Sequence, residues 1–199
     1  HLIFRFCLDL RIFCVSLCLM NEDKNIIVGF DAKRVVRNGT GLGAYGRNLV
    51  NELAALYPNA QLLLYAPDAG REDLARQVKS APNLRMVYPK NAKNALQKAA
   101  WRSSGVVKDL LRDGVEVFHG LSGELPKGVK HAGIDAVVTI HDLIFMRYPQ
   151  LYSYFDRKIH YRKFFYAAQH AQHIIAISEQ TKRDIIHYLK VPESKITVV

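Results

Sequence analysis

Residues 26–46 read IIVGFDAKRVVRNGTGLGAYG. An apolar run ends in Asp31, and four glycines follow between residues 39 and 46, directly before a segment of helical period. An apolar run, a glycine-rich turn and an amphipathic helix are typical of the first unit of a parallel α/β sheet. This stretch therefore predicts an α/β fold.

The same alternation continues along the chain. Further apolar runs predict strands at residues 62–66, 84–87, 115–119, 136–141, 173–177 and 196–199. Apolar residues at helical spacing predict helices over residues 44–56, 92–112, 154–171 and 179–189. Strands that alternate with helices form sheets covered on both faces. The predicted fold is α/β, with a Rossmann-like, doubly wound, mostly parallel sheet of seven strands.

Length and composition indicate one globular domain. The chain has 199 residues, and 49% of them are hydrophobic, which excludes intrinsic disorder. Residues 1–19 are apolar but carry scattered charges, so they match neither a signal peptide nor a membrane span. We interpret them as a non-native or untranslated leader before Met20, with an interfacial amphipathic anchor as the alternative. Residues 20–199 form the predicted domain, which is expected to be truncated after Val199.

Cysteines and net charge limit the partners. Cys7, Cys14 and Cys18 all lie in the leader, so a disulfide framework is not expected in the domain, and a cytoplasmic location is favoured. No metal site is indicated, because the spacing of Cys and His fits none. The net charge of +10 indicates an anionic partner such as a nucleotide, an anionic membrane or nucleic acid.

Polar side chains stand where the predicted strands end, and ligands of parallel sheets bind at that edge. His141 beside Asp142 can hydrogen-bond a sugar hydroxyl or a phosphate oxygen, so we expect a functional role. His119 has the simpler alternative of closing a strand. Ser178 is first interpreted as a helix N-cap, and Glu179 as a complement to the helix dipole.

The glycine segment predicts an anion-binding loop, formed by Gly39, Thr40, Gly41, Leu42 and Gly43. Glycines permit backbone conformations that turn N–H groups toward one phosphate, and a helix N-terminus adds partial positive charge. A tight turn with positive φ is the simpler alternative. The run from Gly41 to Gly46 also matches the dinucleotide fingerprint, with Asp68 at a suitable distance, so an NAD(P)-dependent oxidoreductase is an alternative. Against it, about ten residues separate Asp31 from the fingerprint.

Two basic segments suggest a surface for a further partner. Residues 145–166 interleave aromatic and cationic side chains, which can stack on sugars or bind anionic lipids or single-stranded nucleic acid. A helix packed in the core with a solvated basic face is the alternative. The helix predicted over residues 92–112 has either a membrane-facing or a merely soluble basic face, which carries Lys90, Lys93, Lys98, Arg102 and Lys108.

Taken in order, these motifs resemble glycosyltransferase family 4. The resemblance covers residues 26–199 and rests on IVGFD at 27–31, GTGLGAY at 39–45, VTIHDL at 138–143, YP at 148–149, IAISEQTK at 175–182 and VP at 191–192 with KITVV at 195–199. It implies the N-terminal, acceptor-side half of a GT-B enzyme that transfers a hexose, such as mannose, from a nucleotide sugar to a lipid-linked or oligosaccharide acceptor in cell-surface polysaccharide synthesis. It implies retention of the anomeric configuration without metal or cofactor.

The resemblance also assigns roles to residues. The loop from Gly39 to Gly43 would lie against the donor phosphates or sugar, and His141 with Asp142 would reach the transferred sugar. The crevice would be lined by Arg37, Tyr45, His119, Ser178 and Glu179. The family's paired glutamates belong to the C-terminal domain, so we expect the chain alone to be inactive. We expect a cytoplasmic protein with peripheral contact to an anionic membrane and without nucleic acid as partner.

Overall fold

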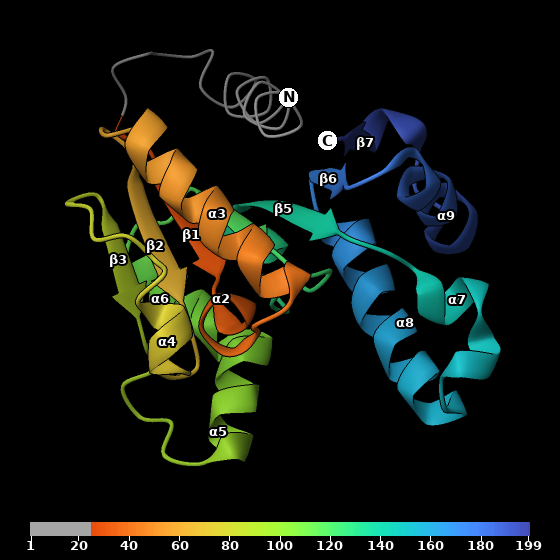
Figure 1. Cartoon of the computed structure of the whole chain (residues 1–199), viewed down its shortest axis with the longest axis horizontal. Helices are drawn as coiled ribbons and strands as arrows, with labels where there is room; N and C mark the ends of the chain where they lie inside the picture. The colour runs from red at the N-terminus through yellow and green to blue at the C-terminus, as the bar shows by residue number, and fades with distance from the viewer. Residues whose placement is uncertain (1–24) are drawn as a thin grey trace.

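The computed structural model describes residues 25–199, which form a sheet covered by helices (Figure 1). The strands are β1 Ile27–Asp31, β2 Gln61–Tyr65, β3 Leu84–Val87, β4 Val117–Gly120, β5 Asp135–Ile140, β6 His173–Ala176 and β7 Ile196–Val198. Their order is β3-β2-β1-β4-β5-β6-β7, and every neighbouring pair is parallel. The predicted Rossmann-like, doubly wound sheet is confirmed. The expected leader at residues 1–19 lies outside the described residues.

Helices connect the strands. They are α2 Lys33–Arg37, α3 Gly41–Leu56, α4 Glu72–Ala75, α5 Ala95–Ala100, α6 Val106–Arg112, α7 Ile144–Arg147, α8 Tyr154–His170 and α9 Glu179–Leu189. A π-helical segment, Trp101–Gly105, joins α5 to α6, and three 3₁₀ turns span Lys130–Ala132, Pro149–Leu151 and Glu193–Lys195. The helix predicted over residues 92–112 begins three residues later, because the Asn94 side chain caps the N–H of Gln97.

The central strands are apolar on both faces because helices cover both. In β2, Leu62 and Leu64 belong to a cluster that includes Leu49 and Val50 of α3. Leu63, between them, points to the opposite face and joins a second cluster with side chains of α6, α8 and α9. Continuous apolar runs, rather than alternating ones, are therefore the correct signal for these strands.

The connection between β1 and α3 differs from the prediction. A short helix, α2, occupies most of it, and its Val35 and Val36 are fully buried. The next helix starts at Gly41, so residues 41–46 are helical and not a loop. The glycines with positive φ among the described residues lie elsewhere, at positions 70, 114, 123, 128 and 133. The prediction that this segment uses glycine for unusual backbone conformations is therefore wrong.

Candidate active site

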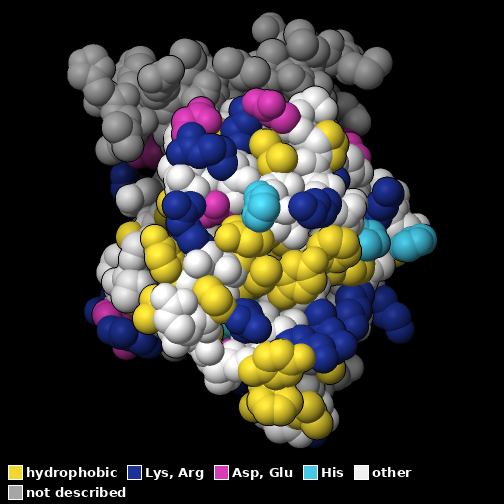
Figure 2. Space-filling view, turned by 90° about the vertical axis from the view of Figure 1, so that its right-hand side faces the viewer, with side chains coloured by type: hydrophobic (Ala, Val, Ile, Leu, Met, Phe, Trp, Pro, Cys, Tyr) yellow, Lys and Arg dark blue, Asp and Glu magenta, His cyan; other side chains and the backbone are white. Residues whose placement is uncertain are grey.

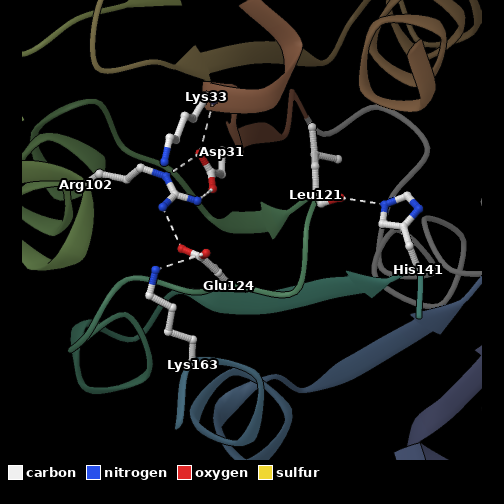
Figure 3. A network of polar contacts seen from close by, with 7 residues as sticks. All are labelled: Asp31, Lys33, Arg102, Leu121, Glu124, His141 and Lys163. Carbon is white, nitrogen blue, oxygen red and sulfur yellow. Dashed lines mark hydrogen bonds and ion pairs between the residues drawn. The ribbon is translucent and has the colours of Figure 1, made fainter. Parts of the chain in front are cut away.

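His141 follows β5 at the carboxyl edge of the sheet. Its Nε2 lies 3.0 Å from the carbonyl oxygen of Leu121, and because a carbonyl only accepts, Nε2 must carry the proton (Figure 3). Burial lowers the pKa of His141, although the Leu121 carbonyl and the Asp142 carboxylate oppose this effect. The ring is therefore mostly neutral at pH 7, with a lone pair on Nδ1. An edge-to-face contact with Tyr45, with ring centroids 4.8 Å apart, fixes its orientation.

Asp142 takes a local structural role. Its side chain is exposed, and its Oδ1 accepts a hydrogen bond from the N–H of Ile144 at 3.1 Å. This bond satisfies a free donor at the start of α7. Asp142 lies next to His141 in the chain and affects its pKa through charge, but no hydrogen bond joins the two side chains among the described contacts.

His119 and Tyr45 meet at one hydroxyl beneath this edge. The Oγ1 of Thr139 lies 2.8 Å from His119 Nε2 and 3.0 Å from the Tyr45 hydroxyl. Thr139 is fully buried and His119 is only 4% exposed, so this cluster forms the floor of the site rather than an open surface. Burial lowers the pKa of His119 to about 3, and the ring is therefore neutral.

The glycine segment forms the N-terminal turn of α3. The side chain of Asn38, rather than that of Thr40, caps this turn, since Asn38 Oδ1 accepts from the N–H groups of Thr40 and Gly43 at 2.9 and 3.2 Å. Gly43 is required for packing, because a Cβ there would lie 1.8 Å from the carbonyl oxygen of Asn38. A Cβ at Gly41 would meet nothing within 4 Å, so the first turn faces open space. An anion can therefore approach the exposed N-terminus of this helix.

The residues predicted to line the crevice lie in separate parts of the structure. Ser178 caps α9 by accepting from the N–H of Thr181 at 3.1 Å, which confirms the capping interpretation. The hydroxyl of Thr181 in turn donates to the carbonyl oxygen of His141, so the start of α9 is held beside the candidate site. Glu179 is exposed in the same turn.

Arg37, which was predicted to line the crevice, is engaged by an acid. It forms an ion pair with Asp68, which also accepts from Lys98 at 2.9 Å. The hydrogen bond from Arg37 lowers the pKa of Asp68 to about 2. Asp68, the residue that an oxidoreductase would use for ribose, is thus already held by two cations.

A buried ion-pair network that was not predicted from the sequence lies near the candidate site (Figure 3). Arg102 donates to Asp31 Oδ1 at 3.1 Å and to Glu124 Oε2 at 2.6 Å. Lys163 of α8 adds a second cation to Glu124 at 3.3 Å. Burial raises the pKa of Glu124, but these two cations outweigh burial and hold it below its usual value. In the sequence, only the position of Asp31 at the end of a predicted strand indicated a polar site here.

The predicted basic face of residues 92–112 is wrong at two positions. Arg102 points inward, with its side chain 17% exposed, and Lys98 is paired with Asp68. A surface-bound helix needs its cations on the outside, so these two cannot contact a membrane in this state.

The N-terminal part of α8 and the turn before it expose apolar side chains. Leu151, Tyr154 and Phe155 are 68%, 61% and 75% exposed, so the alternative of a core-packed aromatic helix is wrong for this part. The guanidinium of Arg157 and the ammonium of Lys158 lie 5.8 and 5.7 Å from the Tyr154 ring centroid. In the view of Figure 2 apolar side chains gather beside lysines and arginines on this side of the molecule.

Comparisons with known proteins identify the family. The model of Glycosyltransferase Family 4 matches residues 39–199, so the chain belongs to glycosyltransferase family 4. No curated protein sequence matches it.

Solved structures resemble the chain at low identity. One is the lipopolysaccharide outer core galactosyltransferase WaaB in its apo form, at 12% identity and a TM-score of 0.49, with 87% of this chain and 44% of that chain covered. A glycosyltransferase from Rickettsia africae has 13% identity, a TM-score of 0.49 and coverage of 89% and 43%. The wall teichoic acid polymerase TagF has 12% identity, a TM-score of 0.45 and coverage of 98% and 46%. The chain spans less than half the length of these structures.

Proposed function

We propose that residues 20–199 are the acceptor-side, N-terminal domain of a GT-B glycosyltransferase. The enzyme would transfer a hexose, such as mannose, from a GDP-, UDP- or ADP-linked sugar to a lipid-linked or oligosaccharide acceptor in cell-surface polysaccharide synthesis. Family membership and the contact of His141 with Tyr45 of α3, at the carboxyl edge of the sheet, support this proposal. Because the chain belongs to a glycosyltransferase family, neither an oxidoreductase nor a nucleic-acid-binding protein is proposed.

We infer the role of His141 from its tautomer. Its Nε2–H is used by Leu121, so the neutral ring offers Nδ1 as an acceptor for a hydroxyl of the transferred sugar. Protonation would turn Nδ1 into a donor, and burial opposes protonation. Asp142 would assist only through its charge. The N–H groups of Gly41 and Leu42, in the first turn of α3, would face the donor phosphates together with the partial positive charge of the helix N-terminus, whereas the N–H of Gly43 is already bonded to Asn38.

Transfer would retain the anomeric configuration and need no metal, and the chain alone would be inactive, since the donor-binding domain would complete the site. The test is single-turnover transfer by a protein that joins this chain to a second Rossmann-like domain, with a panel of nucleotide sugars. We expect His141→Ala to slow transfer by roughly ten- to a hundredfold with a nearly native melting temperature. His141→Gln serves as the control that keeps a polar side chain.

Several results would contradict the proposal. Wild-type turnover from His141→Ala would remove this residue from the reaction. Inversion of the product anomer, read by nuclear magnetic resonance, or loss of transfer on adding a chelator would overturn the retaining, metal-independent chemistry. Saturable NAD binding to the chain in calorimetry would restore the oxidoreductase alternative.

We further propose cytoplasmic location with peripheral contact to an anionic membrane through the exposed end of α8. Aromatic side chains beside lysines and arginines are the composition of membrane interfaces. In the described residues 25–199 no helix is both long and apolar enough to cross a membrane. Vesicle flotation tests the contact: Phe155→Ser should weaken binding to anionic vesicles, and the equally drastic Leu111→Ser on α6 should not. Equal effects of both changes, or binding that ignores salt, would contradict it.

A further inference from the structure

A cavity of about 670 Å³ opens at the carboxyl edge of the sheet. Its wall is built from the segments that follow β1, β2 and β4, from the helix that runs through α5 and α6, and from α8. The ion-pair network of Arg102 lies in this wall, whereas His141 is not among the lining residues. The cavity is therefore distinct from the crevice at His141.

The cavity is rich in positive charge. Its lining includes two carboxylates, Asp31 and Glu124, and both are engaged by Arg102. Its cationic side chains are Lys33, Arg37, Lys98, Arg102, Lys127, Arg162 and Lys163. Asp68 pairs with Arg37 and Lys98, but cations still outnumber acids in and around this wall.

Three of the cations are left without an acid. Lys33, Lys127 and Arg162 form no ion pair with any described residue. Burial is the main cause that lowers the pKa of Lys33, and repulsion from Arg102 adds to it, while Glu124 and Asp31 offset these effects only in part. An anion that entered the cavity would relieve this repulsion.

The rest of the wall is apolar. Trp101 and Tyr166 lie in it with Ile159, whose side chain is 53% exposed. A small inorganic anion would leave this surface uncovered, whereas a ligand with an anionic head and a hydrocarbon or ring part would cover it. The combination favours an amphipathic ligand.

We propose that this cavity binds the phosphoryl head of a lipid-linked acceptor, with the free lysines and Arg162 on the phosphate oxygens and the apolar wall along the lipid. Charge-assisted hydrogen bonds from arginine and lysine are the usual means of holding phosphate. This inference rests on the proposed function and deepens it, since it selects a phosphorylated lipid from the two acceptor classes.

The chain contains a natural fluorescent probe for this site. Trp101 is its one tryptophan and lines the cavity, so intrinsic fluorescence reports occupancy. We would titrate the chain with a short-chain prenyl diphosphate, with the matching uncharged prenol and with inorganic pyrophosphate. The expected result is a saturable change with the prenyl diphosphate that is about tenfold or more weaker in Lys127→Glu and in Arg162→Glu. Both residues are exposed and unpaired among the described residues, so these variants should fold.

Lys108→Glu is the matched control. Lys108 is exposed on α6, outside the cavity lining, and the substitution changes the net charge by the same amount. Equal weakening by Lys108→Glu, equal affinity for prenol and prenyl diphosphate, or no saturable signal would each overturn the site. Binding of pyrophosphate with no added affinity for the prenyl diphosphate would overturn the lipid. No sugar is transferred in this titration, so its outcome is independent of the transfer assay.

Discussion

Replacing Arg102 by methionine should destabilise the fold strongly at neutral pH. The side chains of Arg102, Asp31 and Glu124 are 17%, 7% and 20% exposed, so the substitution leaves two nearly buried carboxylates without their shared cation. Breaking a buried ion pair by removing one partner costs about 3–5 kcal/mol. Glu124 keeps Lys163 at 3.3 Å, so we expect a value near the lower end, about 3 kcal/mol. For a domain of this size that is a fall of roughly 10 °C in melting temperature.

The effect should depend on pH in a defined direction. The pKa of Glu124 is held below its ordinary value in the folded protein, so its ion pairs stabilise the fold above the unfolded pKa and are lost as pH falls through the folded pKa. In Arg102→Met much of that depression disappears. The difference in free energy of unfolding between the wild type and the variant should therefore shrink below about pH 4.

Urea unfolding followed by circular dichroism at several pH values measures both effects. Adding Asp31→Asn to Arg102→Met should recover part of the loss, because it removes one stranded carboxylate. Arg76→Met is the surface control: Arg76 and its partner Glu72 are both 77% exposed, and we expect little change. A loss at pH 7 no larger than that of the control, or a difference that stays constant down to pH 3, would refute the reasoning.

Three further predictions concern the fold. Gly43→Ala should destabilise the protein, because its Cβ would overlap the carbonyl of Asn38, whereas Gly41→Ala should not; equal melting temperatures for the two variants would contradict this. Ser178→Ala should cost about 1 kcal/mol in urea unfolding through loss of the α9 cap, and the absence of any loss would mean that another group replaces it. Deleting residues 1–19 should leave soluble expression and melting temperature unchanged or improved; loss of membrane association on deletion would favour the anchor interpretation.

The fold was largely predictable because local signals determine it. Every strand predicted from an apolar run is present among the described residues, and β2 shows why: Leu62 and Leu63 face opposite helical layers, so both must be apolar. His141 could be placed at the sheet edge for the same reason, since the strand boundary is visible in the sequence. The helix over residues 179–189 was predicted with the correct ends, because Ser178 and the Val191-Pro192 pair mark them.

The contacts of the site were not predictable from local patterns. Arg102 and Asp31 are 71 residues apart in the chain. Arg102 points inward, although the lysines of the same segment suggest a basic surface. The backbone conformation of the glycine segment was predicted wrongly for a different reason. Gly43 and Gly46 are needed where α3 approaches Asn38 and Val35 closely, and sequence alone does not separate that need from the need for positive φ.

The π-helical segment at residues 101–105 has a mechanical consequence. It joins α6, which anchors itself through Val106 and Leu110, to α5, which buries none of its own residues. With so little apolar contact, unwinding of α5 costs far less than global unfolding. Since Ala95, Lys98 and Ala99 line the cavity, we expect local unwinding of α5 to open this wall while the sheet stays intact. A long ligand could then enter through the opened wall at α5 instead of passing end-on through the cavity opening.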